Sequence, residues 1–183
     1  VHMAKAADGT ANWYALKVFW NKVFEIEHIL SQDGRESYIP CRKVIVESGG
    51  VKKEERKTLI PSLMFFRATE QYACDLQSRL VDKIMLYSYL DRNNVRHPSP
   101  VPEHEMRMFM LVTSAGDDGL ECFPEEYMRY KVGEKVRVTG GIFKGAEGFV
   151  KRIKHNRRLT VTLTGVCMVA TSYIEPFFLE KID

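Results

Sequence analysis

The chain has 183 residues, of which 45% are hydrophobic and 28% charged, and its formal net charge is +3. This composition is that of an ordinary soluble globular chain rather than a disordered one, and the length allows one large domain or two small ones. No apolar run approaches the length of a membrane span, and no charged-then-apolar leader is visible, so we expect no membrane association.

Four cysteines are widely separated and form no C-x-x-C pair: Cys41, Cys74, Cys122 and Cys167. With five scattered histidines they make no zinc pattern, and free thiols without a disulfide framework are typical of a reducing compartment. We therefore expect a cytoplasmic protein that holds no metal and no cofactor.

The first third of the chain predicts two strands around one helix. Residues 13–19 are rich in aromatic and branched side chains, as in a strand. Asn21 is the expected cap of a helix that continues through Ser31 on an apolar face. A second strand is expected over residues 37–46, with Pro40 near its start, where a missing donor is tolerated.

A basic arm and a third strand follow. Ser48-Gly49-Gly50 predicts a turn. It leads into an arm whose basic residues are Lys52, Lys53, Arg56 and Lys57. Residues 59–68 are almost continuously apolar and predict the third strand.

The next elements complete an α+β pattern. A short helix is expected from Thr69 to about Leu80, and a fourth strand over residues 84–90. Pro102 is suited to the first position of a last helix, with acidic residues favourable in its first turn. The order β-α-β-β-α-β-α predicts an α/β sandwich with an antiparallel-rich four-stranded sheet.

Charge then reverses abruptly along the chain. Residues 113–127 contain five carboxylates and no Lys or Arg, whereas residues 131–158 contain nine Lys/Arg against two Glu, a net charge of +7. Such a reversal indicates a boundary between two units. We predict a first domain over residues 10–115, a linker over 116–128 and a second domain over 129–183.

The second domain predicts a small all-β barrel. Apolar residues alternate with the period of half-buried strands at Val136, Val138, Leu159, Val161 and Leu163. Between them lie Gly140, Gly141, Gly145 and Gly148, a density typical of tight turns or of backbones in close approach. Short strands joined by such turns favour an SH3-like barrel.

Residues 131–163 resemble a KOW motif, and the chain from Trp13 onward is similar to the NusG family, which joins an NGN domain to a KOW barrel. The matches are Trp13-Tyr14 in the first strand, Ile60-Pro61-Ser62-Leu63-Met64-Phe65-Phe66 after the basic arm, Pro98-Ser-Pro-Val-Pro102 before the last helix, and Ile174-Glu-Pro-Phe-Phe-Leu-Glu-Lys181 at the end. The resemblance implies a non-catalytic transcription elongation or antitermination factor.

Two departures from the family pattern suggest a specialised paralogue. Ser62 stands where Gly or Asn is expected, followed by Leu63 in place of an aromatic residue, and residues 83–90 replace a glycine-rich strand. These features resemble the RfaH and UpxY groups, the latter serving capsular polysaccharide loci of gut bacteria. The implied role is to suppress pausing or termination on a specific operon.

The resemblance also implies a site for RNA polymerase. In the family, the NGN domain docks on the clamp helices of the polymerase. The matching residues here are Phe19, Ile60, Leu63 and Phe65. Leu63 and Phe65 share one face of a strand, and the sequence leaves open whether they form a docking patch or belong to the core.

Two basic segments are candidate nucleic-acid sites. Lys52, Lys53, Arg56 and Lys57 would neutralise phosphates of non-template DNA or upstream duplex, although Glu54 and Glu55 interrupt them. On the barrel, the candidates are Lys151, Arg152, Lys154, Arg157 and Arg158. Their partner would be nascent RNA, or a ribosomal protein or termination factor bound by the barrel. Both segments are also compatible with simple solvation.

Other functions are less well supported by the residues. A ribosome-associated or general RNA-binding protein would explain the KOW motif but not the complete NGN-like half. An enzyme would need a catalytic constellation, and we find no P-loop, nucleophile elbow, H-E-x-x-H or separable acid pair. We therefore predict no catalytic residues.

Overall fold

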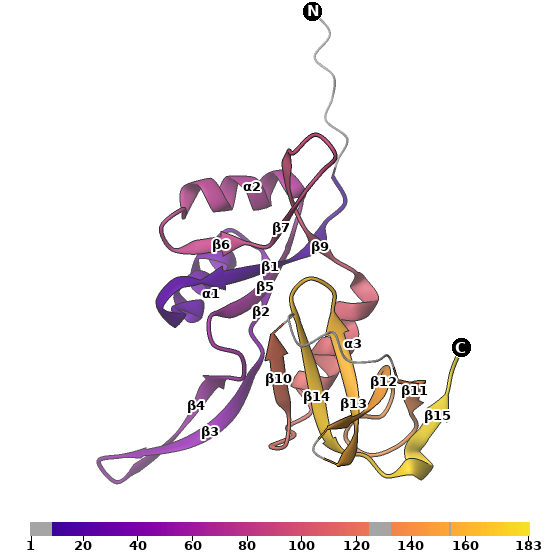
Figure 1. Cartoon of the computed structure of the whole chain (residues 1–183). Coiled ribbons are helices and arrows are strands. Elements are labelled where there is room, and N and C mark those ends of the chain that lie inside the picture. The colour runs from indigo at the N-terminus through magenta and orange to yellow at the C-terminus, as the bar shows by residue number, and fades with distance from the viewer. Residues whose placement is uncertain (1–8, 125–132, 154) are drawn as a thin grey trace, which may run out of the picture. The chain divides into compact units, whose positions relative to one another are not determined.

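The computed structural model describes residues 9–124, 133–153 and 155–183, which divide into two units (Figure 1). The first unit contains the described residues up to Ile39 together with Ser62–Glu103. The second contains Pro40–Pro61 and the described residues from His104 to Asp183. No helix in these ranges is long and apolar enough to cross a membrane.

An antiparallel sheet forms the centre of the first unit. Its order is β2 (Glu36–Tyr38), β5 (Leu63–Ala68), β1 (Asn12–Val18) and β6 (Ile84–Leu86), and β9 (Pro100–Val101) also pairs with β1. β1 is central because its apolar run fills both faces: Trp13, Tyr14, Ala15, Leu16 and Val18 are all buried. The predicted α+β sandwich with an antiparallel-rich sheet is confirmed, with β9 as an additional short strand.

Two helices and a small hairpin complete this unit. α1 (Val23–Gln32) packs on β2 and β5, and α2 (Glu70–Arg79) on β6 and on β8 (Arg96–Pro98), which pairs with β7 (Ser88–Leu90) (Figure 1). The Oγ1 atom of Thr69 accepts a hydrogen bond from the Tyr72 amide at 3.3 Å and so caps α2.

Four expected boundaries differ in the structure. Asn21 does not cap α1, because its backbone is left-handed (φ 55°) and its side chain accepts a hydrogen bond from the Ser62 amide at 2.8 Å. The strand expected over 37–46 breaks at Pro40 into β2 and β3 (Cys41–Ser48), which belong to different sheets. The strand expected over 84–90 breaks at Tyr87, and β5 begins only at Leu63.

The second unit contains a hairpin, a helix and a β domain. β3 pairs with β4 (Val51–Thr58) along its whole length, and α3 spans Glu103–Thr113. The β domain is a six-stranded antiparallel sheet in the order β10-β14-β13-β12-β11-β15. Its strands are β10 (Glu121–Pro124), β11 (Lys135–Val138), β12 (Glu147–Ile153), β13 (Asn156–Leu163), β14 (Cys167–Tyr173) and β15 (Leu179–Lys181).

The glycines of the β domain have the roles that the sequence predicts. Gly141 and Gly145 have φ of 75° and 90°, which only glycine adopts without strain. Gly148 lies where two strands approach closely, since a Cβ there would be 2.3 Å from the Thr160 carbonyl oxygen. The predicted small all-β domain is confirmed, while the domain limits at 115 and 129 stay a prediction. β10 lies within the expected linker.

Candidate functional site

The chain leaves β1 through a tightly held turn. The Val18 amide donates to the Ser62 carbonyl at 2.7 Å, and the Phe19 amide donates to the Lys83 carbonyl at 2.9 Å. Phe19 is half-buried, and the ring of Trp20 meets it edge-on with 6.0 Å between centroids. Trp20 is 76% exposed at φ 54°, a backbone conformation rare for a bulky residue.

Sequence reasoning selected Phe19 and missed Trp20. The available signal was the polar pair Asn21-Lys22 directly after an aromatic strand, which indicates that the chain turns at Trp20 and brings it to the surface.

The other expected polymerase-binding residues are less exposed. On β5, Leu63 lies opposite Lys17, and Phe65 lies between Ala15 and Tyr38; they are 3% and 0% exposed. Ile60 is half-buried and belongs to the second unit. Only Phe19 and Ile60 of the four therefore present any apolar surface.

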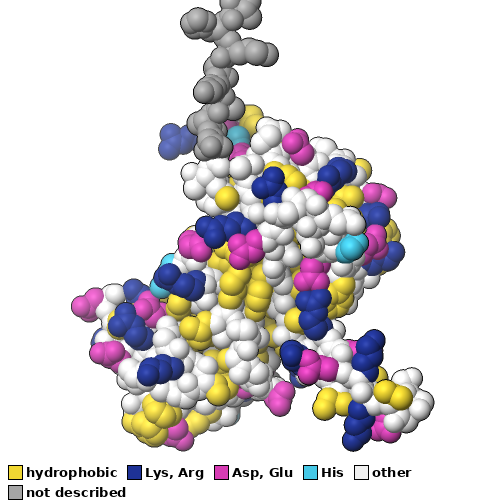
Figure 2. Space-filling model, turned by 180° about the vertical axis from the view of Figure 1, so that it is seen from behind, with side chains coloured by type: hydrophobic (Ala, Val, Ile, Leu, Met, Phe, Trp, Pro, Cys, Tyr) yellow, Lys and Arg dark blue, Asp and Glu magenta, His cyan; other side chains and the backbone are white. Residues whose placement is uncertain are grey.

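The basic arm is the second strand of the β3–β4 hairpin. Lys53 lies 3.9 Å from Glu55, whereas no ion pair within the described part of the chain joins Lys52 or Lys57 to a carboxylate. Figure 2 shows that the hairpin, at the lower right, carries basic, acidic and hydrophobic side chains together.

Two further basic residues join the arm across the hairpin. Arg42 lies opposite Lys57, and Lys43 lies opposite Arg56 and pairs with Glu54 at 2.7 Å. Both were missed by sequence reasoning, although counting back from the Gly49-Gly50 turn would have placed them across from the arm.

The structure separates the basic residues predicted on the β domain. Arg152 and Arg157 are exposed and lie directly opposite each other on β12 and β13. Arg158 is only 12% exposed, and its Nη1 pairs with Glu121 Oε1 at 2.8 Å. Lys151 is half-buried, and burial lowers the pKa of its ammonium group. Lys154 lies outside the described residues.

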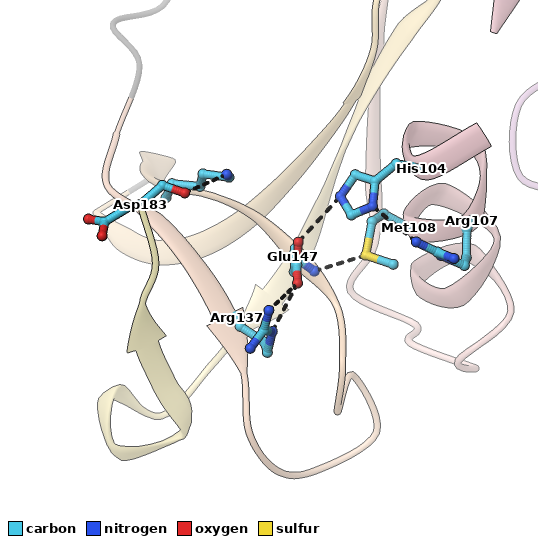
Figure 3. Close-up of polar contacts among 7 residues, drawn as sticks. His104, Arg107, Met108, Arg137, Glu147 and Asp183 are labelled. Atoms are coloured by element: carbon cyan, nitrogen blue, oxygen red, sulfur yellow. Dashed lines mark hydrogen bonds and ion pairs between the residues drawn. The ribbon is translucent and has the colours of Figure 1, made fainter. Parts of the chain in front are cut away.

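A polar cluster joins α3 to β12 within the second unit (Figure 3). Arg137 donates to Glu147 Oε1 through Nε at 2.9 Å and Nη2 at 2.8 Å, and His104 Nε2 lies 3.3 Å from Glu147 Oε2. The Glu147 amide donates to the Met108 sulfur at 3.1 Å. The Arg137 guanidinium holds the pKa of Glu147 below its usual range. These contacts connect the Glu147 carboxylate to Arg137 on β11 and to His104 on α3.

The first unit is built on an antiparallel sheet flanked by helices, and the second contains a small all-β domain. The sequence profile described as "Transcription termination factor nusG" matches residues 11–110. The chain therefore belongs to the NusG family, whose members are non-catalytic transcription factors that bind RNA polymerase.

Among solved structures, the chain is similar to one described as "Domain interaction in Thermotoga maritima NusG". The two sequences are 21% identical. The match covers 95% of this chain and 98% of that one, with a TM-score of 0.48. No curated protein matches the chain.

Proposed function

We propose that this protein is a transcription elongation or antitermination factor that binds the clamp helices of RNA polymerase and suppresses pausing or termination. The family match over residues 11–110 carries this proposal, because it covers nearly all of the first unit and the whole hairpin. A cytoplasmic location follows from that role.

The proposed polymerase contact uses the partly exposed Phe19 of the first unit, and Ile60, half-buried in the second unit, is a separate candidate. A coiled-coil tip needs apolar surface into which its side chains can pack. Leu63 and Phe65 are buried, so we assign them the task of supporting that surface from beneath.

Retention of RNA polymerase on the immobilised full chain tests this contact. We expect Phe19→Ala to weaken retention and Val95→Ala, at an exposed apolar residue on the β7–β8 turn, to leave it unchanged. A double Leu63→Ser, Phe65→Ser variant would disturb the core and is unsuitable alone. Wild-type protein that does not retain polymerase would refute the function, whereas an inert Phe19→Ala would refute only the assigned contact.

The hairpin is the proposed contact for non-template DNA or upstream duplex. Lys52 and Lys57 support this, since neither is neutralised within the described residues, with Lys53 and Arg56 beside them. Replacing Lys52 and Lys57 by Gln should flatten the salt dependence of DNA binding by about 0.9 log units per lost phosphate contact. Lys144→Gln, at an exposed position of the β domain, is the matched control.

Action on a specific operon, such as a capsular polysaccharide locus, is the finer part of the proposal. Its support is the RfaH- or UpxY-like departure of the sequence at Ser62 and over residues 83–90. Transcription by purified polymerase should show more readthrough on a capsule-operon leader than on an unrelated template. Equal effects would indicate a general factor.

A ribosome-associated or general RNA-binding role is the alternative. Co-sedimentation with ribosomes, together with no retention of polymerase, would favour it over the proposed function.

A further inference from the structure

We propose that a groove in the β domain binds an acidic, apolar peptide segment of a partner protein. The groove has a volume of about 350 Å³ and lies between the β12–β13 hairpin and β15. We call it the arginine groove, after Arg152 and Arg157 on its wall. The groove belongs to the second unit, and its lining residues are distinct from Phe19 and Ile60, the residues proposed to contact polymerase.

The wall of the arginine groove is positively charged without internal neutralisation. Arg152 and Arg157 are direct cross-strand partners. Lys181 also lines the groove, and its ammonium group pairs at 3.1 Å with Glu134, a carboxylate that also lines it. Within the described part of the chain, no ion pair joins either arginine to a carboxylate. The described lining residues therefore carry a net charge of +2.

This arrangement costs stability in the free protein. Like charges directly opposite each other on antiparallel strands repel. A bound carboxylate converts that repulsion into attraction, because guanidinium forks match carboxylates in a bidentate geometry. The arginine pair is thus better suited to holding an anionic group than to stabilising the fold.

The floor of the groove is aliphatic. Val136 and Leu179, which flank the β11–β15 pairing, line it together with Val150. Val150 and its cross-strand partner Leu159 lie on the same face of the sheet as Arg152 and Arg157, and Leu159 belongs to the core. A ligand that carries aliphatic side chains beside its carboxylates would gain by burying them here.

These features favour a peptide over RNA. Binding of a single strand depends on bases that stack on aromatic rings, and none of the described residues that line the groove is aromatic. Phe177 follows the lining residue Pro176 and is 74% exposed, so it could add apolar surface at the rim. RNA is therefore included as a competing ligand in the test.

The test measures binding of fluorescent probes to the full chain. The probes are a short peptide of alternating Glu and Leu, the same peptide with Gln for Glu, and an oligouridine. We expect the acidic peptide to bind, the Gln peptide to bind weakly, and the double variant Arg152→Gln, Arg157→Gln to lose about tenfold in affinity per guanidinium. Arg92→Gln, at an exposed arginine of the first unit, is the control.

The melting temperature separates loss of binding from loss of fold. Because the double variant relieves a repulsion, its melting temperature should not fall below that of the wild type. The proposal is overturned if the acidic peptide does not bind, if it binds the double variant equally, or if oligouridine binds more tightly and depends on the same arginines.

Discussion

Two neighbouring residues after β1 carry unusual backbone conformations. Trp20 and Asn21 have φ of 54° and 55°, and Ser62, which hydrogen-bonds to Asn21, has φ of 64°. Left-handed backbone costs about 1–2 kcal/mol at a residue other than glycine, although Asn tolerates it better than most. Sequence patterns cannot reveal such a cost, because the contacts that impose it link positions 41 residues apart.

Substitutions at Asn21 should separate the side-chain hydrogen bond from the backbone preference. Asn21→Gly keeps the conformation and loses the bond to Ser62, so we expect a loss of about 1 kcal/mol in unfolding free energy. Asn21→Ala also adopts an unfavourable φ and should lose about 1 kcal/mol more. Urea unfolding measures both, and equal stabilities of the two variants would contradict this account.

His97 should make the first unit sensitive to pH. Its Nδ1 lies 3.2 Å from Glu70, and its Nε2 lies 3.4 Å from Asp91; these partners raise the pKa of His97 above its ordinary 6.5. Because the folded pKa is the higher one, protonated His97 stabilises the fold below the unfolded pKa, and this stabilisation is lost as pH rises through the folded pKa.

An NMR titration of the His97 ring checks this prediction. Glu70→Gln removes the principal partner and should lower the pKa of His97 toward 6.5. A wild-type ring that already titrates at 6.5 would show that the two carboxylates do not act on it.

At the scale of elements, periodicity identified segments well and their ends poorly. The aromatic β1, the Thr69-capped α2 and α3 were all predictable because their signals are local. Residues 37–46 were not, because Pro40 separates two strands that pair in different sheets, and pairing is a tertiary property.

The same limit applies to the candidate site. Arg157 and Arg158 are adjacent and equivalent in the sequence, yet they take different roles. The strand alternation places them on opposite faces, and Arg158 is the one whose guanidinium pairs with Glu121 on β10 among the described residues. A count of basic residues identifies this segment but cannot tell which of its arginines forms an ion pair. That depends on Glu121, which lies 37 residues before Arg158.

A substitution at Gly148 tests whether close approach of two strands requires glycine there. In Gly148→Ala the new Cβ would meet the Thr160 carbonyl oxygen at 2.3 Å, and a backbone atom cannot move aside cheaply. We expect a loss of about 1–3 kcal/mol. Lys144→Ala, at an exposed position, should change stability by less than about 0.5 kcal/mol. Similar midpoints in chemical denaturation would show that the sheet yields readily.

At the scale of the molecule, the units are not continuous in sequence. The chain passes from one to the other at Ile39–Pro40, Pro61–Ser62 and Glu103–His104. The predicted limits at 115 and 129 rest on composition, which reports charge along the chain, and they stay a prediction. The segment after α3, predicted as a linker, makes specific contacts within the second unit.

Asp117 makes two of those contacts. Its Oδ1 accepts from the Gly119 amide at 2.9 Å and its Oδ2 from the Ser172 amide at 2.7 Å. We expect a broad-specificity protease to cut near Gly116–Gly119 slowly in the wild type and faster in Asp117→Ala, with the products identified by mass. Unchanged cleavage would mean that these two contacts do not restrain the segment. That result would favour a flexible joint between domains.

The length of the β3–β4 hairpin has an electrostatic consequence. Eight residues in each strand span about 25 Å, and charges are screened in physiological salt over about 8 Å. Lys52 near the turn and Arg42 near the base therefore hardly sense each other's charge. Substitutions near the turn can change what the hairpin attracts with little effect on the rest of the chain, so its specificity can diverge between relatives while the fold stays the same.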